Sequence, residues 1–153
     1  MKNRFYSLVK NRNCICINGC ISDSEGEEDF VVFPEYTDML SGLAKTFDDN
    51  IKEIVDSKIK TQNNDSSKII KVKTFLINKI LEEHNITHID FVSIDTEGAE
   101  LSILQTIDFD KINIDYFTIE NNNYDNKIKN FMKSKGYKLI EILGCDELYK
   151  KIK

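Results

Sequence analysis

The sequence predicts an α/β fold with a doubly wound parallel sheet. Segments with strand patterns alternate along the chain with segments that have helical patterns, as in βαβ units. An apolar run over residues 89–94 ends abruptly in acidic residues, and a helical pattern follows at once. Such a junction is where open α/β sheets bind ligands. With 153 residues the chain fits one domain, residues 1–153, that can bury roughly 70% of its unfolded surface.

The first half of the chain is expected to begin with the end of a helix over residues 3–12. A strand is predicted over 13–21, where a period of two places Cys14, Cys16 and Cys20 on one face and isoleucines on the other. A strand that is apolar on both faces is typical of the interior of a parallel sheet. The next predicted elements are a turn over 22–26, a short strand over 30–33, a loop over 36–43 and an amphipathic helix over 46–59.

The second half repeats the alternation more regularly. A strand is predicted over 69–72, followed by a helix that Thr74 can cap. The tail after Gly144 is expected to pair as a last, antiparallel strand. Between this helix and the tail, the patterns predict strand 89–95, helix 98–107, strand 113–120, helix 125–135 and strand 137–142.

Composition argues against several classes of partner. The chain has 26 acidic and 21 basic residues, a net charge of -5, and no massed basic segment, which disfavours nucleic acid. No stretch approaches the ~20 apolar residues of a membrane span, and the N-terminus lacks the apolar core of a signal peptide. We therefore expect a cytoplasmic protein that contacts neither nucleic acid nor membrane.

Metal ligation by cysteine or histidine is not expected. The four cysteines lack paired Cys-x-x-Cys spacing and a nearby histidine, so a structural role is favoured over zinc. His84 and His88 flank a predicted helix-to-strand turn, and each is expected to be solvated or to cap the helix.

Carboxylates gather where the predicted strand 89–95 meets its helix. Asp95, Glu97 and Glu100 could accept hydrogen bonds from a ligand, act as a general base on a hydroxyl, or bind a hard cation. Alternatively, they are acids at a helix start that face water, where the helix N-terminus favours negative charge. Spacing alone leaves both interpretations open.

Two further strand ends favour a functional site. The strand predicted over 113–120 ends in Glu120, and the strand predicted over 13–21 is followed by Ser22 and Asp23. The carboxyl ends of parallel strands lie at one edge of a sheet, so these polar side chains would face one crevice. Chance solvation explains one such strand end better than three.

These segments resemble the FkbM family of methyltransferases. The core of the resemblance is Asp95-x-Glu97-Gly98-x-Glu100, preceded by an apolar strand and followed by Leu101, Ile103 and Leu104. Further segments occur in the order found in the family: residues 20–27, 36–42, the strand over 69–72 and Ile119-Glu120-Asn121. The resemblance covers the chain from about residue 4 to its end.

The resemblance implies a Rossmann-like class I methyltransferase sheet that binds S-adenosylmethionine and transfers its methyl group, usually to a hydroxyl oxygen. The acceptor would be a small molecule or a glycan. By position in that fold, Asp95 and Glu97 would be catalytic. Cofactor binding would fall to Ser22, Asp23 and Asp95, and acceptor binding to Glu100 and Glu120.

The sequence departs from the family pattern at its start. The glycine-rich turn after a first strand is absent, and none of the six glycines forms a Gly-x-Gly cluster. Residues 3–12 match the helix that follows the second strand of the fold, so the sheet is expected to be truncated, with strands 1 and 2 missing. An upstream segment or a second chain could complete it.

Two other functions remain open at this point. One is a degenerate, non-catalytic α/β module that acts through protein–protein contact at an unfinished sheet edge. The other is a cation-dependent enzyme that uses Asp95, Glu97 and Glu120 as oxygen ligands.

Overall fold

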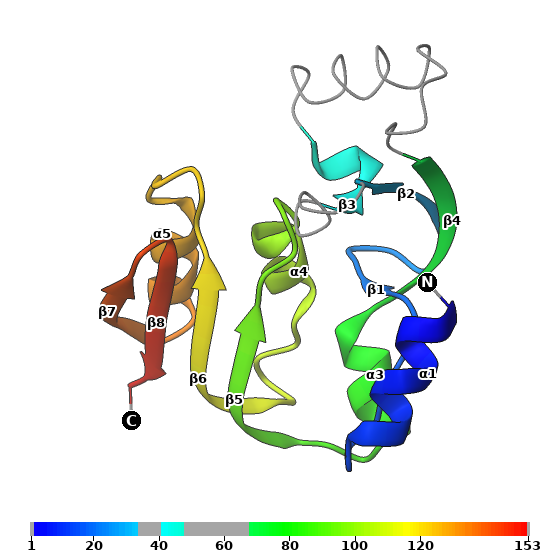
Figure 1. Cartoon of the computed structure of the whole chain (residues 1–153). Coiled ribbons are helices and arrows are strands. Elements are labelled where there is room, and N and C mark those ends of the chain that lie inside the picture. The colour runs from blue at the N-terminus through cyan, green and yellow to red at the C-terminus, as the bar shows by residue number, and fades with distance from the viewer. Residues whose placement is uncertain (1, 34–40, 48–67, 153) are drawn as a thin grey trace.

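The computed structural model of the chain describes residues 2–33, 41–47 and 68–152. These residues form an α/β protein with two mixed four-stranded sheets and four α-helices (Figure 1). In this part of the chain, no helix is long and apolar enough to cross a bilayer. The predicted α/β class is therefore confirmed.

The first sheet has the strand order β1-β4-β2-β3. β1 runs parallel to β4, whereas β2 runs antiparallel to both β4 and β3. A short 3₁₀ helix, η2, follows β3. The elements of this half are α1 (Lys2–Asn11), β1 (Cys20–Ile21), β2 (Gly26–Val32), β3 (Gly42–Leu43), η2 (Ala44–Thr46), β4 (Lys68–Phe75) and α3 (Ile77–Glu83).

The second sheet has the strand order β5-β6-β8-β7. β5 and β6 are parallel, and β8 runs antiparallel to both of its neighbours, which confirms the predicted antiparallel last strand. Gly144, at φ +71°, lies in the turn between β7 and β8. The elements are β5 (His88–Ile94), α4 (Glu100–Thr106), β6 (Asn113–Glu120), α5 (Lys127–Ser134), β7 (Tyr137–Leu143) and β8 (Asp146–Lys151).

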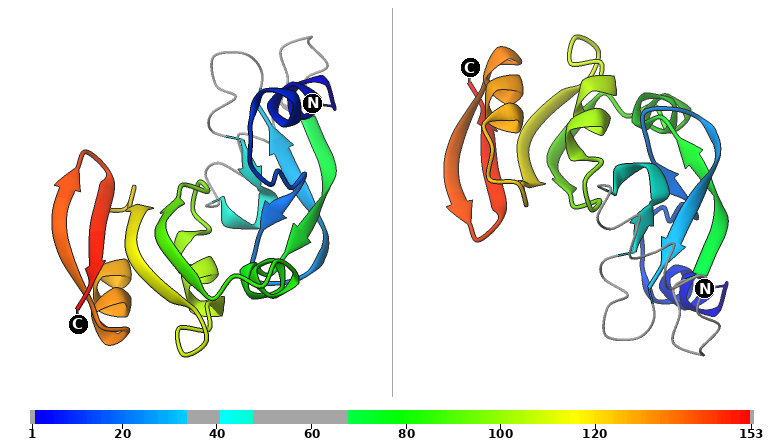
Figure 2. Two further views of the ribbon diagram at one scale, coloured as in Figure 1. Left: turned by 90° about the horizontal axis from the view of Figure 1, so that it is seen from below. Right: turned by 90° about the horizontal axis from the view of Figure 1, so that it is seen from above.

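The main core lies between the second sheet and helices α4 and α5, which cover the same face of it (Figure 2). The opposite face is more open, and Phe91 there is 52% exposed. Burial of large side chains supplies most of the stabilisation of this half, because each contributes about 1.5–3 kcal/mol. The largest fully buried side chains in the core are Phe117, Tyr137, Tyr149, Ile103, Leu104, Ile114, Ile119 and Met132.

The prediction of one parallel sheet was wrong. Apolar alternation predicts that a segment is a strand, but it carries no information on the direction of the neighbouring strand. β2 and β4 pair antiparallel from Gly26↔Thr74 to Val32↔Lys68, which makes a separate mixed sheet.

The predicted interior strand over residues 13–21 was also wrong. Only Cys20–Ile21 pair as a strand, and Ile15 is 63% exposed. The alternation of cysteine and isoleucine lacks partners within the described residues, and a strand pattern without a neighbouring strand does not form a sheet.

Thr74 does not cap a helix. It lies within β4, where its side chain is buried. The N-cap of α3 is Leu76, two residues after Thr74. His84 does end α3, since its backbone N–H contacts Glu82 O and Ile80 O. The predicted helix over 46–59 lies outside the described residues apart from its first positions, which are the end of η2 and the extended Phe47.

Candidate active site

The loop between β5 and α4 turns sharply through two left-handed residues. Glu97 has φ +54° and Gly98 has φ +101°. A Cβ atom on Gly98 would lie 3.1 Å from Thr46 O, so this position combines an unusual backbone conformation with a close backbone approach. Glu97 is a non-glycine residue in a conformation that costs roughly 1–2 kcal/mol. The loop is therefore strained, and this strained backbone conformation sets the position of its acidic side chains.

Glu100 holds this loop in shape. Its Oε1 atom accepts hydrogen bonds from Thr96 N (2.9 Å), Thr96 Oγ1 (2.9 Å) and Gly98 N (3.1 Å). The residue is only 7% exposed. The third carboxylate of the motif thus binds the loop itself, and its expected contact with an acceptor stays a prediction.

Residues of β3 and η2 also contact the loop. Thr46 Oγ1 lies 3.0 Å from Glu97 O and 2.9 Å from Leu43 O. Gly42 is close as well, since a Cβ there would lie 3.4 Å from Glu97 Cβ. Residues far apart in sequence therefore fix the backbone of Glu97 from two sides.

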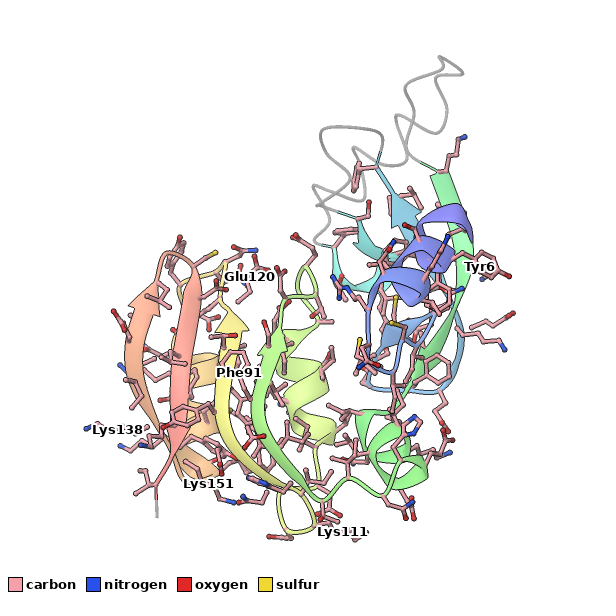
Figure 3. The ribbon with its side chains drawn as sticks, turned by 60° about the horizontal axis from the view of Figure 1, so that its bottom comes forward. Tyr6, Phe91, Lys111, Glu120, Lys138 and Lys151 are labelled. Atoms are coloured by element: carbon pink, nitrogen blue, oxygen red, sulfur yellow. The ribbon has the colours of Figure 1, made fainter. Side chains whose placement is uncertain are left out.

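Three carboxylates converge where β5 and β6 end. One oxygen each from Asp95, Glu97 and Glu120 lies within 4.8 Å of the others. Figure 3 shows Glu120 at the arrowhead end of β6, beside the loop that follows β5. The parallel pairing of Ile94 with Ile119 places the two strand ends side by side. The structure thus brings together the carboxylates of two neighbouring strands, as the sequence predicts.

Crowding changes the acidity of this cluster. Burial, followed by the negative charge of Asp95, raises the pKa of Glu120 to about 7, although a hydrogen bond from Asn122 opposes the change. Burial and the charges of Asp95 and Glu100 also raise the pKa of Glu97. Glu120 Oε2 is buried and has no hydrogen-bond partner among the residues that the structure describes. A group of this kind holds a proton near neutral pH until a cation or a donor arrives.

Two cavities border the cluster. One, of about 250 Å³, lies between the end of β1, residues 41–43 and the β5–α4 loop, and Asp95 lines it. The other, of about 210 Å³, lies between the starts of α4 and α5, and Glu120 and Glu100 line it. The carboxylates can thus face two different ligands or two parts of one ligand.

Ser22 and Asp23 belong to a separate polar cluster around Lys45. The Lys45 ammonium lies 2.9 Å from Ser22 Oγ, 2.5 Å from Asp23 Oδ1 and 2.7 Å from Glu28 Oε1, which matches its three N–H donors. The hydrogen bond from Lys45 lowers the pKa of Asp23. Ser22 is 1% exposed, so Asp23 is the residue of the pair that presents surface to a ligand. Their expected role in cofactor binding stays a prediction.

Asn121 supports the end of β6. Its amide nitrogen donates to Asp125 O (2.9 Å) and to Glu147 Oε1 (3.0 Å), and the Tyr149 hydroxyl donates to the other oxygen of the same carboxylate. Asn121, Glu147 and Tyr149 are all buried. This network holds the strand end that carries Glu120.

No role for Lys45, Thr46 or Asn121 was predicted from the sequence. Lys45 contacts Asp23, which is 22 positions away, and Thr46 contacts Glu97, which is 51 positions away. A single lysine or threonine carries no local signal of such a contact. Asn121 belongs to the Ile119-Glu120-Asn121 segment of the family resemblance. Its contact with Glu147 could not be predicted, because Glu147 lies on another strand.

A family model described as Methyltransferase FkbM domain matches residues 3–139. The chain belongs to this FkbM family. The match covers most of the chain and confirms the resemblance carried by the acidic loop. No curated protein and no solved structure matches the chain. Family membership supports a methyltransferase.

Methyltransferases of this kind imply S-adenosylmethionine as methyl donor, and the residues fit it on one side only. Asp95 and its neighbours offer negative charge toward a sulfonium. The chain lacks a Gly-x-Gly turn to approach a nucleotide closely. Within the described residues, the carboxylates therefore suit a positively charged sulfonium, whereas no Gly-x-Gly turn is present for a nucleotide.

Proposed function

We propose that this chain supplies the methyl-transfer side of an S-adenosylmethionine-dependent methyltransferase that acts on hydroxyl groups. The observation that carries the proposal is the convergence of Asp95, Glu97 and Glu120 within 4.8 Å at the ends of two parallel strands, in a chain of the FkbM family. The acceptor class we propose is a small molecule or a glycan.

The reaction asks the protein mainly for position and for one proton acceptor. The sulfonium of the bound cofactor supplies an activated methyl group. Asp95 orients the acceptor hydroxyl and takes its proton, with Glu97 as the second candidate for this role. Glu120 and Glu100 line the neighbouring cavity, where they bind the acceptor. Crowding raises the pKa values of Glu97 and Glu120. A positive charge beside the cluster, such as the sulfonium, would favour the ionised carboxylates and so lower these pKa values.

The topology supports a truncated Rossmann-like sheet. The usual strand order of class I methyltransferases is 3-2-1-4-5-7-6. The order β5-β6-β8-β7 corresponds to its second half, with β8 as the antiparallel strand. Among the described strands, β1 and β5 are each the terminal strand of a sheet. We propose that strands from an upstream segment or a second chain fill the place between them and complete the cofactor site.

The cellular setting we propose is the cytoplasm. All four cysteines are free thiols, including Cys14 and Cys16, whose sulfur atoms lie 3.8 Å apart. Free thiols at this distance are compatible with a reducing compartment.

Methyl transfer from labelled S-adenosylmethionine to a panel of hydroxyl-bearing glycans and small molecules tests the proposal, using the chain with its completing segment supplied. Asp95→Asn should abolish transfer, whereas Asp110→Asn, in the exposed turn before β6, should leave it unchanged. Equal transfer by both variants would show that the acidic cluster is not the site of the reaction.

The same geometry favours a second candidate, a cation-dependent enzyme. Carboxylate oxygens within 4.8 Å of one another are suited to magnesium, calcium or manganese. A rise in melting temperature with one of these cations, lost in Glu120→Gln, would support this function. An unchanged melting temperature would rule it out.

A further inference from the structure

A second group of potential ligands lies at the other end of β5 and β6. One ligand atom each from His88, Asp90 and Asp115 lies within 4.8 Å of the others. His88 Nε2 lies 3.1 Å from Asp115 Oδ2. These residues are at the start of the two strands, whereas the Asp95 cluster follows their ends. Figure 3 labels Lys151, a neighbour of Asn113 through a 2.7 Å hydrogen bond, at this opposite end.

The strand register explains why the three side chains meet. His88 and Asp90 are two residues apart on β5, so they project from the same side of the strand. β5 pairs with β6 through His88↔Asn113 and Ile89↔Ile114, which places Asp115 across from Asp90. Two alternate residues on one strand and one residue on its neighbour give three ligands on one face and leave the remaining coordination positions to solvent or to another ligand.

The chemistry of the set selects a class of metal. One imidazole and two carboxylates are ligands that suit zinc and similar transition ions, whereas the all-carboxylate Asp95 cluster suits hard cations. Asn113 steadies one ligand, because its amide donates to Asp115 Oδ1 at 3.2 Å and leaves Oδ2 facing His88. An outer contact of this kind fixes the orientation of a ligating carboxylate.

An open cavity adjoins the group. It measures about 580 Å³ and is lined by Asp115, Asn113, Tyr116, Lys150 and Lys151. The positive charges of Lys150 and Lys151 lower the affinity of the site for a cation alone. The same charges would attract an anion, which could then also bind the metal. The cavity offers room for such a ligand beside the open coordination positions.

We propose that His88, Asp90 and Asp115 form a binding site for zinc or a similar divalent transition metal, with an open coordination position toward the adjoining cavity. The site is independent of the methyltransferase proposal, since it shares no residue with the Asp95 cluster. A surface ion pair between His88 and Asp115 is the simpler explanation of their contact, and it predicts no response to zinc.

The chain's histidine content gives a clean assay. His84 and His88 are the only histidines, so proton NMR shows one Hε1 signal from each imidazole. Adding zinc to the intact chain should shift the His88 signal and leave the His84 signal in place. In calorimetry, His88→Ala should weaken zinc binding by more than about tenfold, and Asp90→Asn and Asp115→Asn should weaken it similarly. His84→Ala is the matched control and should bind zinc normally.

Two further variants exclude other ligands. Cys14→Ser with Cys16→Ser removes the closest pair of thiols, and Glu120→Gln disrupts the carboxylate cluster; both should retain zinc binding. Binding should weaken in acid, because coordination requires an unprotonated imidazole. Zinc binding that survives His88→Ala, that depends on the cysteines or Glu120, or that is absent from the intact chain would overturn the proposal. Because the readouts are binding and NMR, failure here leaves the methyltransferase proposal untouched.

Discussion

Replacing Glu120 with glutamine should stabilise the protein in a manner that depends on pH. The carboxyl is buried beside Asp95, and its pKa rises from the ordinary 4.5 to about 7. A carboxyl with a higher pKa in the folded than in the unfolded protein stabilises the fold in acid, and this contribution is lost as the pH rises from 4.5 through 7. Glutamine has the shape of the protonated side chain and does not titrate.

The size of the effect follows from the difference between the two pKa values. At about 1.4 kcal/mol per pH unit, the change from 4.5 to about 7 corresponds to about 3.5 kcal/mol, and solvent screening at this partly exposed side chain reduces it to about 3 kcal/mol or less. Glu120→Gln should therefore match the wild-type free energy of unfolding near pH 4.5 and exceed it by up to about 3 kcal/mol at pH 8. Because the charge of Asp95 is the second cause of the raised pKa, Asp95→Asn should shrink this difference.

Urea unfolding followed by circular dichroism at a series of pH values between 4.5 and 8 measures the effect. Glu141→Gln, at an exposed position on β7, is the matched control and should show no such trend. A Glu120→Gln advantage that stays constant over this range would refute the reasoning, since only a titrating group produces a slope.

Three further substitutions test the loop and its support. Gly98→Ala should destabilise the protein by about 2 kcal/mol, and by more than Gly136→Ala, because both positions have positive φ but only Gly98 lies against Thr46 O; equal losses in urea unfolding would argue against the close approach. Glu97→Asn should stabilise the fold by about 1 kcal/mol at pH 8, because asparagine tolerates the left-handed conformation and removes one crowded charge; a loss of stability in the same assay would contradict this. Tyr149→Phe should cost about 1–3 kcal/mol through the buried Glu147 carboxylate, while the exposed Tyr124→Phe should cost nothing measurable; similar melting temperatures for the two variants would show that the network is not stabilising.

The second half of the chain follows its sequence pattern closely. The predicted strand over 113–120 coincides with β6, and the antiparallel tail is β8. In this half, strands and helices alternate with short connections, so local periodicity and global topology agree. The convergence of Asp95 with Glu120 could be predicted for the same reason, because neighbouring parallel strands end at one edge.

The first half could not be predicted from pattern alone. The alternation of Cys14, Cys16 and Cys20 indicates a strand, but burial requires neighbouring strands that the sequence does not specify. The antiparallel pairing of β2 with β4 joins residues more than thirty positions apart, which local patterns do not encode. Likewise, the bonding of Glu100 to the loop depends on the turn at Glu97 and Gly98. The backbone angles of this turn bring the backbone N–H groups of Thr96 and Gly98 to the Glu100 carboxylate.

We propose that the chain carries the methyl-transfer side of a site, and that an upstream segment or a second chain supplies the nucleotide side. A calorimetric titration with S-adenosylhomocysteine tests this proposal most directly. It compares this chain alone with the chain joined, before α1, to the first two strands of the family's fold, including their glycine-rich turn and intervening helix. We expect no binding by the chain alone and one binding site in the extended protein. Binding by the short chain with equal affinity would contradict the need for a completing segment, and absence of binding by both proteins would contradict the methyltransferase proposal.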